Sequence, residues 1–405
     1  MSIADITAKV PALAEMQETL YKHLHENPEL SMVETETRAL IVGKLTEYGY
    51  DVKEVGGGVV GVLANGQGRT VLFRADIDAL PVQEATGLDY ASTKVMKDQD
   101  GIEQPVMHAC GHDMHVVAGL GAAQLLAEHK DTWSGTYIAL FQPAEETAQG
   151  AQSMVNAGLI EAIPKPDVCL GQHVLASPVA GKVAVASGPI LSTAVSAKVT
   201  VYGKGSHGSM PHLGVDPVLL ASSIVVRLQS VVAREIAPGD FGVITVGALQ
   251  AGQKANIIPD RAELRINFRA YSEDIRDQLV EAMERIVKSE CEASRSPKEP
   301  EFEYSDSYPL TDNDEQAALA VTEALREGLG AERVEYMLPV TASEDFSNIP
   351  RAFDVPYVYW GLGGYTEGSP VYPNHNPSFA PAIQPTLTTG TEAAVSAVLG
   401  FLRKA

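Results

Sequence analysis

The chain has 405 residues, of which 45% are hydrophobic and 20% charged, and its formal net charge is −22. This length is sufficient for two domains, and the composition is that of an ordinary globular protein. So negative a chain repels nucleic acids and anionic membranes, and no run approaches the roughly 20 apolar residues that cross a bilayer. We therefore expect neither nucleic acid nor membrane as a partner.

Cysteine usage and the first residues bear on location. Cys110, Cys169 and Cys291 are few, odd in number and far apart, which argues against a disulfide scaffold and favours a reducing compartment. The first residues lack the basic start and apolar run of a signal peptide. We therefore expect a cytoplasmic protein.

The first part of the chain alternates helices with short β-rich runs. Apolar residues at steps of three and four predict a helix over 5–26, ended by Asn27-Pro28, and a second helix over 33–48. Strands are predicted over 58–63, 70–73, 136–142 and 167–170, and helices over 114–128 and 151–157. Such alternation predicts an α/β sheet covered by helices on both faces.

The pattern changes near residue 187. Strands over 194–202, 242–249, 262–270 and 301–304, with helices over 217–233 and 272–293, follow the β-α-β-β-α-β order of a ferredoxin-like unit. From residue 312 the chain returns to helix, strand and a last helix over 387–403. We predict an α/β domain in two segments, 1–186 and 306–405, interrupted by an inserted α+β domain over 187–305.

A histidine- and cysteine-rich segment lies between a loop and a predicted helix. It reads His108-Ala109-Cys110-Gly111-His112-Asp113-Met114-His115. Thiolate and imidazole groups this close together are ligands for a borderline-soft ion such as zinc, and the glycine lets the backbone fold close to a metal. We predict that Cys110 and His112 are ligands, that Asp113 caps the helix and that His115 packs internally.

A pair of carboxylates follows the strand over 136–142. One of Glu145 and Glu146 could ligate metal while the other takes a proton from metal-bound water, although a bare Glu-Glu pair is more often a solvated turn. His173 follows another strand and His375 lies in a late loop. The prediction of a site rests on all these residues occurring at strand ends or in loops, where open α/β sheets bind ligands.

Several segments together resemble one family. They are His25-Glu26-Asn27-Pro28-Glu29-Leu30-Ser31, Arg74-Ala75-Asp76-Ile77-Asp78-Ala79-Leu80-Pro81, His108–His112, Gln142–Glu146, Gly205–His212, Asn256-Ile257-Ile258-Pro259 and Ser343-Glu344-Asp345-Phe346. Over about residues 20–400 the chain is similar to the dinuclear metal aminoacylase/carboxypeptidase family, in its hippurate hydrolase and indole-acetyl-amino-acid hydrolase branch. The resemblance implies a zinc-peptidase-like α/β/α catalytic domain whose inserted domain serves as lid and dimerisation domain.

The resemblance also implies a set of residue roles. Two divalent metal ions would be held by Cys110, His112, Glu146, His173 and His375, with the thiolate of Cys110 bridging them. Glu145 would be the general base, and Asp78 would support a metal ligand. His207 would stabilise the oxyanion in the active site of a partner subunit, with His212 as the weaker candidate.

The expected reaction is hydrolysis of an N-acyl amino acid to a carboxylic acid and a free amino acid. Asn256 and Arg269 match family positions that grip the substrate carboxylate, which a guanidinium fork suits. Zinc is the expected metal, with manganese or cobalt as alternatives, and a homodimer through the inserted domain, or a higher homo-oligomer, is expected by analogy. The alternatives are a dipeptidase, an N-acetyl-diaminopimelate-type deacetylase and a non-catalytic metal or solute binder.

Overall fold

The computed structural model describes residues 2–99 and 101–404, which divide into two compact units. Unit 1 comprises the described residues up to Ile190, Asp312–Leu338, and those from Asp345 onward; unit 2 comprises Leu191–Thr311 and Pro339–Glu344. The sequence placed the short segment Pro339–Glu344 in the catalytic domain. It belongs to unit 2 because Val340 bridges to Leu191 and the carbonyl of Ala342 accepts a hydrogen bond from the Ser192 N–H.

Unit 1 is built on an eight-stranded mixed sheet in the order β1-β2-β6-β3-β7-β18-β8-β17. Strands β3, β6, β7 and β18 run parallel, and their nearly continuous apolar sequences are buried on both faces, as parallel sheets require. The strands of the sheet are β1 (Asp51–Val55), β2 (Gly58–Asn65), β3 (Thr70–Asp76), β6 (Gly135–Gln142), β7 (Val168–Val179), β8 (Val183–Val185), β17 (Val334–Tyr336) and β18 (Tyr357–Tyr365).

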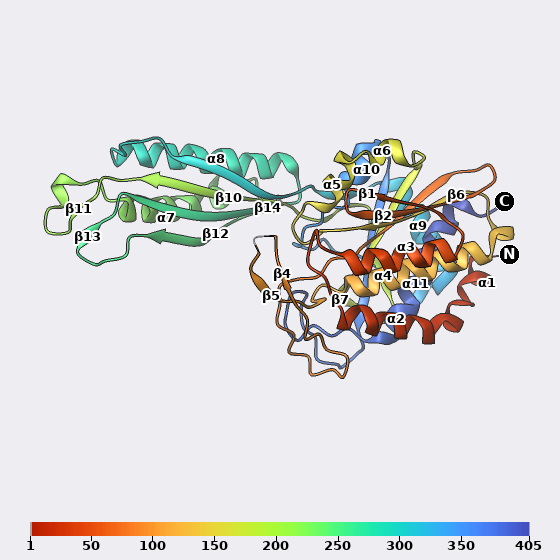
Figure 1. The fold of residues 1–405 in the computed structure, drawn as a ribbon. Helices are drawn as coiled ribbons and strands as arrows, with labels where there is room; N and C mark the ends of the chain where they lie inside the picture. Colours follow the sequence, from red (N-terminus) through yellow and green to blue (C-terminus); the bar gives the residue numbers. More distant parts are fainter. Residues whose placement is uncertain (1, 100, 405) are drawn as a thin grey trace. The chain divides into compact units, whose positions relative to one another are not determined.

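Helices cover both faces of this sheet, which confirms the predicted α/β class (Figure 1). On one face lie α5 (Gly150–Asn156), α6 (Leu159–Ala162) and α10 (Asn348–Phe353). On the other lie α2 (Ala14–Glu26), α3 (Thr35–Glu47), α4 (His112–Glu128) and α11 (Ile383–Leu402), with α1 (Ile3–Thr7) and α9 (Glu315–Leu329) packed on α11. The smaller elements are β4 (Val95–Lys97), β5 (Glu103–Pro105), β9 (Gly188–Leu191), β16 (Thr311–Asn313), η1 (Val10–Leu13), η2 (Lys130–Thr132) and η4 (Ala331–Arg333).

Unit 2 is a four-stranded antiparallel sheet with both of its long helices on one face. The strand order β12-β14-β10-β15 and the chain order β-α-β-β-α-β are those of the ferredoxin-like arrangement. Its elements are β10 (Thr193–Tyr202), β11 (Ser206–His207), η3 (Pro211–Leu213), α7 (Pro217–Arg234), β12 (Gly242–Ala251), β13 (Ile257–Ile258), β14 (Arg261–Ala270), α8 (Glu273–Ala293) and β15 (Glu301–Tyr308).

The first predicted helix is interrupted, and one helix of unit 2 is long and apolar. The single helix predicted over 5–26 is three shorter elements, because Pro11 lacks the N–H that a continuous α-helix needs and α2 begins only after a 3₁₀ turn. Within the described residues, α7 alone is long and apolar enough to cross a membrane. Its residues Leu220, Ile224 and Leu228 belong to the core of unit 2, which is the arrangement of an ordinary domain helix.

Candidate metal centre

Parallel strands bring the predicted site residues to one edge of the sheet of unit 1. β3 and β6 run side by side from Thr70 and Thr136, so Asp78 and the turn that bears Glu145 leave their strands at the same edge. β7, on the other side of β3, carries His173. The carboxyl ends of parallel strands are where open α/β sheets place ligand sites, so this convergence follows from the topology.

Two short backbone features set the positions of the side chains. Gly111 begins α4 with φ +85°, and a Cβ there would lie 2.3 Å from Cγ1 of Val174, so only glycine allows the close approach to β7. Ala144 has φ +48°, an uncommon conformation for a residue with a side chain, and its N–H donates to Oε1 of Glu34 at 2.9 Å. This turn directs Glu145 and Glu146 toward α4.

The predicted ligands form two groups that share one thiol. Cys110, His112 and His173 have ligand atoms within 4.8 Å of one another, and so do Cys110, Glu146 and His375. The thiol of Cys110 lies 3.5 Å from Nε2 of His173, and Nε2 of His375 lies 3.2 Å from Oε2 of Glu146. These two overlapping donor sets would hold two divalent cations, with the sulfur of Cys110 available to both sets.

The electrostatics of the ligands favour a bound cation. Burial, together with the nearby carboxylates of Glu146 and Glu145, raises the pKa of the Cys110 thiol well above its usual 9.0. Burial and the neighbouring His115 lower the pKa of His173 well below 6.5, so its ring is neutral and has a lone pair to offer. A metal ion would supply the positive charge that turns the thiol into a thiolate ligand.

His112 provides a direct test of whether a metal fits. Its Nε2 is completely buried and makes no hydrogen bond to the residues that the structure describes. The same atom lies 3.7 Å from Oε1 of Glu146 and 3.8 Å from Oε2 of Glu145, too far for hydrogen bonds. A buried nitrogen directed at carboxylates across this gap fits a metal ion between them, because burying an unsatisfied polar atom otherwise costs free energy.

Asp78 connects the predicted ligand His112 to the turn that bears Glu145 and Glu146. Its Oδ1 accepts a hydrogen bond from the N–H of Glu145, and its Oδ2 accepts one from the N–H of Glu146, both at 3.1 Å. The ring of His112 directs Nδ1 at the Asp78 carbonyl at 2.9 Å and at Oδ1 at 3.3 Å, which leaves Nε2 for a metal. The Ser31 hydroxyl donates to Oδ2 at 2.6 Å, so the carboxylate itself is held in place.

His115 is placed in the core, as the sequence analysis expects. Its Nδ1 donates to Oδ1 of Asp76 at 2.5 Å and its Nε2 accepts from the N–H of Val174 at 2.8 Å. Although burial alone would raise the pKa of Asp76, the neighbouring His112, His115 and Arg74 lower it well below the usual 3.8. With both ring nitrogens of His115 occupied, this residue supports β7 beside His173 rather than binding metal.

Several supporting residues were not found from the sequence. Glu34 holds the turn before Glu145, and Arg74 joins Asp76 to Asp345 across the sheet, with its Nη1 2.6 Å from Oδ2 of Asp76. Asp113 is not the N-cap of α4, which is Gly111; its Oδ1 accepts from the Met114 N–H in the first turn of the helix, and its Oδ2 accepts from a buried His25. His25, Arg74, Asp76 and Asp345 lie in the segments 25–31, 74–81 and 343–346 that carry the family resemblance, whereas Glu34 lies outside them.

Unit 2 carries the three remaining predicted residues at opposite ends. β11 pairs with β13, so His207 lies beside Asn256, whose carbonyl accepts from the Gly208 N–H at 2.8 Å (Figure 1). Arg269 lies near the other end of β14, eight residues beyond Arg261, or about 27 Å along the strand. Within unit 2, Asn256 and Arg269 are therefore too far apart to contact one small carboxylate from the same chain.

The chain is similar to known proteins over most of its length. Residues 72–399 match the model of the family described as Peptidase family M20/M25/M40. The chain is 37% identical to thermostable carboxypeptidase 2 of Saccharolobus solfataricus over 88% of each chain, and 36% identical to hippurate hydrolase of Campylobacter jejuni over 83% of this chain and 86% of that protein. A Bacillus subtilis dinuclear metal-binding peptidase of the M20 family superposes with a TM-score of 0.78 and 27% identity, covering 96% of this chain and 99% of that one.

Proposed function

The chain belongs to the peptidase family M20/M25/M40, and on that premise we propose that it is a two-metal amidohydrolase that releases amino acids from N-acyl amino acids. The observation that carries the proposal is the pair of ligand groups sharing Cys110, with Glu145 and Glu146 on one turn beside them. A binder without catalysis needs ligands alone, and a second carboxylate on the same turn supports a residue that accepts a proton.

The chain's own residues account for the proton transfers. Two divalent ions bound by the predicted ligands would lower the pKa of a water and polarise the substrate carbonyl. Glu145 would accept the proton of that water and deliver it to the leaving amine, while Glu146 remains a ligand. Asp78 would hold both residues of the turn in place, because one of its oxygens accepts from the backbone N–H of Glu145 and the other from that of Glu146.

Arg269 is the proposed receptor for the substrate carboxylate. Its guanidinium makes hydrogen bonds only to uncharged groups, and no carboxylate lies within ion-pair distance of it among the described residues. In a chain with 52 acidic and 30 basic residues, a half-buried arginine without an acidic partner is available to bind an anion. A peptide's C-terminal residue offers the same carboxylate, so the relative named as a carboxypeptidase supports activity on short peptides as the second candidate.

We further propose that the working unit is a homodimer in which His207 and Asn256 act in the partner's active site. The distance along β14 keeps these residues away from Arg269 of the same chain, and a small N-acyl amino acid is shorter than that distance. Leu219 and Val226 on the outer face of α7 are 67% and 73% exposed, which supports an interface on unit 2. Zinc is the proposed metal, because the ligands include sulfur and imidazole, and a cytoplasmic setting suits three unpaired buried cysteines.

Amine release from a panel of N-acyl amino acids tests the catalytic proposal. The wild-type protein, loaded with zinc, manganese or cobalt, is compared with Glu145→Gln and with chelator-treated protein. We expect Glu145→Gln to retain metal and fold and to lose at least about a thousandfold in kcat. Near-normal turnover in this variant would remove Glu145 as the base, and no release by fully loaded wild-type protein from acyl or dipeptide substrates would favour the binder.

Mixing two inactive variants tests the shared active site. In a hybrid of one His207→Ala subunit and one Glu145→Gln subunit, a shared site combines the intact Glu145 of the first with the intact His207 of the second. We expect the co-expressed mixture to recover activity that neither parent has, up to about a quarter of the wild-type value for random pairing. If the mixture is no more active than the two parent variants, His207 does not act in the partner's active site.

A further inference from the structure

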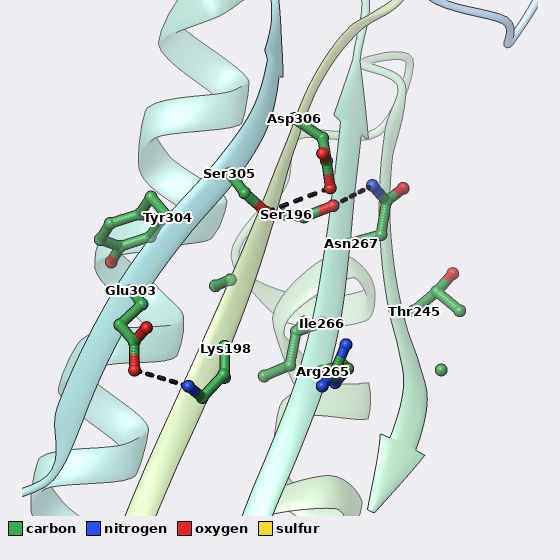
Figure 2. Close-up of a pocket in the computed structure, with 12 residues that line it drawn as sticks. Ser196, Lys198, Thr245, Arg265, Ile266, Asn267, Glu303, Tyr304, Ser305 and Asp306 are labelled. Carbon is green, nitrogen blue, oxygen red and sulfur yellow. Dashed lines mark hydrogen bonds and ion pairs between the residues drawn. The ribbon is translucent and has the colours of Figure 1, made fainter. Parts of the chain in front are cut away.

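The open face of the unit 2 sheet carries a row of polar side chains that ends at Arg269. Along β14, Leu264, Ile266 and Phe268 are buried under α7 and α8, so Arg265, Asn267 and Arg269 alternate onto the opposite face. Figure 2 shows Asn267 on this face beside Ser196, at the border of a depression of about 390 Å³. Arg269 is the next residue on the same face after Asn267.

The guanidinium of Arg269 is fixed by three neutral acceptors. Its Nε donates to Oδ1 of Asn267 at 3.1 Å, and its Nη1 donates to the Thr341 carbonyl at 2.7 Å and to the Ser343 hydroxyl at 3.1 Å. These bonds use the three N–H groups of Nε and Nη1. Nη2, with two N–H groups, makes no hydrogen bond to the residues that the structure describes.

The acceptors are themselves held in place. Nδ2 of Asn267 donates to the Ser196 hydroxyl at 3.2 Å, so rotating its amide by 180° would break this bond and turn an NH₂ group toward the guanidinium (Figure 2). The Ser192 hydroxyl lies 3.2 Å from that of Ser343 and donates to the Thr341 carbonyl at 2.9 Å. The orientation of Arg269 is thus determined by a connected network within unit 2.

We propose that Asn267 is a positioning residue for substrate recognition, which holds Arg269 by a neutral oxygen so that Nη2 presents an undiminished charge to the substrate carboxylate. This inference rests on the proposed function of Arg269 as the carboxylate receptor. Because Nε and Nη1 are occupied, recognition uses Nη2 alone rather than the full guanidinium fork. A carboxylate at position 267 would hold the guanidinium equally well but would neutralise it.

The test compares Asn267→Asp with Asn267→Ala on an N-acyl amino acid and on its carboxamide analogue, using the metal-loaded protein. For the free-acid substrate we expect KM to rise about tenfold in Asn267→Ala and further in Asn267→Asp, with kcat little changed. For the carboxamide, both variants should resemble the wild type. Gln67→Glu, an amide-to-acid change at an exposed position of the turn between β2 and β3, controls for the added negative charge.

A double-mutant cycle with Arg269→Ala separates the proposed role of Asn267 from the proposed role of Arg269, on which it depends. If Asn267 acts through Arg269, Asn267→Asp should change KM no further in the Arg269→Ala background. If Arg269→Ala itself fails to distinguish acid from carboxamide, the receptor role is wrong. If it does distinguish them while Asn267→Asp leaves KM for the acid unchanged, or raises KM for both substrates equally, the positioning role alone is overturned. Thermal unfolding of each variant identifies losses that come from misfolding.

Discussion

The substitution Asp78→Asn removes the charge that links the proposed ligand His112 to the turn that bears Glu145 and Glu146. An asparagine retains one carbonyl oxygen and replaces the other with an NH₂ group. One of the backbone N–H groups of Glu145 and Glu146, now 3.1 Å from an accepting oxygen, would then face a second donor. Because Asp78 is almost completely buried, water cannot replace the lost acceptor.

The size of the effect follows from these contacts. A hydrogen bond to a charged group contributes about 1.5–3 kcal/mol, and a donor left buried without a partner costs about 1–3 kcal/mol. Although burial alone would raise the pKa of Asp78, its hydrogen bonds with His112 and Ser31 lower it below 3.8, so the site favours the ionised form. We therefore expect a loss of about 2–4 kcal/mol in unfolding free energy and a 10- to 100-fold loss in metal affinity.

The assay is metal content after dialysis against buffered zinc, measured together with urea-induced unfolding and kcat/KM. Asp89→Asn, which neutralises an exposed aspartate of the same unit, is the matched control and should leave all three quantities unchanged. If Asp78→Asn binds zinc with wild-type affinity and unfolds at the wild-type urea concentration, the assignment of Asp78 as the link between ligand and turn is refuted.

Three further predictions concern unit 1. Burial alone would lower the pKa of His25, but hydrogen bonds to Asp113 and Glu84 raise it from 6.5 to about 9. The protonated ring therefore contributes about 3 kcal/mol to the free energy of unfolding below pH 6.5, and this contribution is lost as the pH rises through 9. Denaturation from pH 6 to 10 should show this decline in the wild type but not in His25→Gln. Gly111→Ala should reduce bound metal, measured by mass spectrometry, because its Cβ would clash with Val174; unchanged content would contradict this. Removal of metal by a chelator should lower the unfolding temperature, because a metal ion present at a hundredfold its Kd stabilises the folded state by about 2.7 kcal/mol per site. An unchanged unfolding temperature in calorimetry would argue against metal binding to the folded state.

The sequence was a reliable guide to the fold and the family where local patterns carry the information. The helix and strand periodicities predicted an α/β protein, and the motifs identified the family to which the chain belongs. The break in the first helix at Pro11 was missed because proline is tolerated at a helix start as well as disruptive inside one. The strand β1 was missed because its exposed, charged sequence lacks an apolar signal.

In the candidate site, the residues that carry ligand chemistry could be named, but the residues that orient them could not. Glu34 and Arg74 act through contacts with Ala144 and Asp76, and Ala144 lies 110 residues from Glu34 in sequence. No residue type or spacing predicts such a contact before the sheet brings β3 and β6 together. The roles of His207, Asn256 and Arg269 remain predictions, and the structure adds that they cannot all serve one substrate from one chain.

The thiol common to both ligand groups has a consequence for how the enzyme would respond to oxidants. Because Cys110 contributes to both groups, conversion of this one sulfur to a sulfenate or a mixed disulfide would weaken both metal positions together rather than one. Carboxylate ligands undergo no such chemistry. Once that sulfur were oxidised, thiol reductants would restore the ligand set, whereas added metal alone would not.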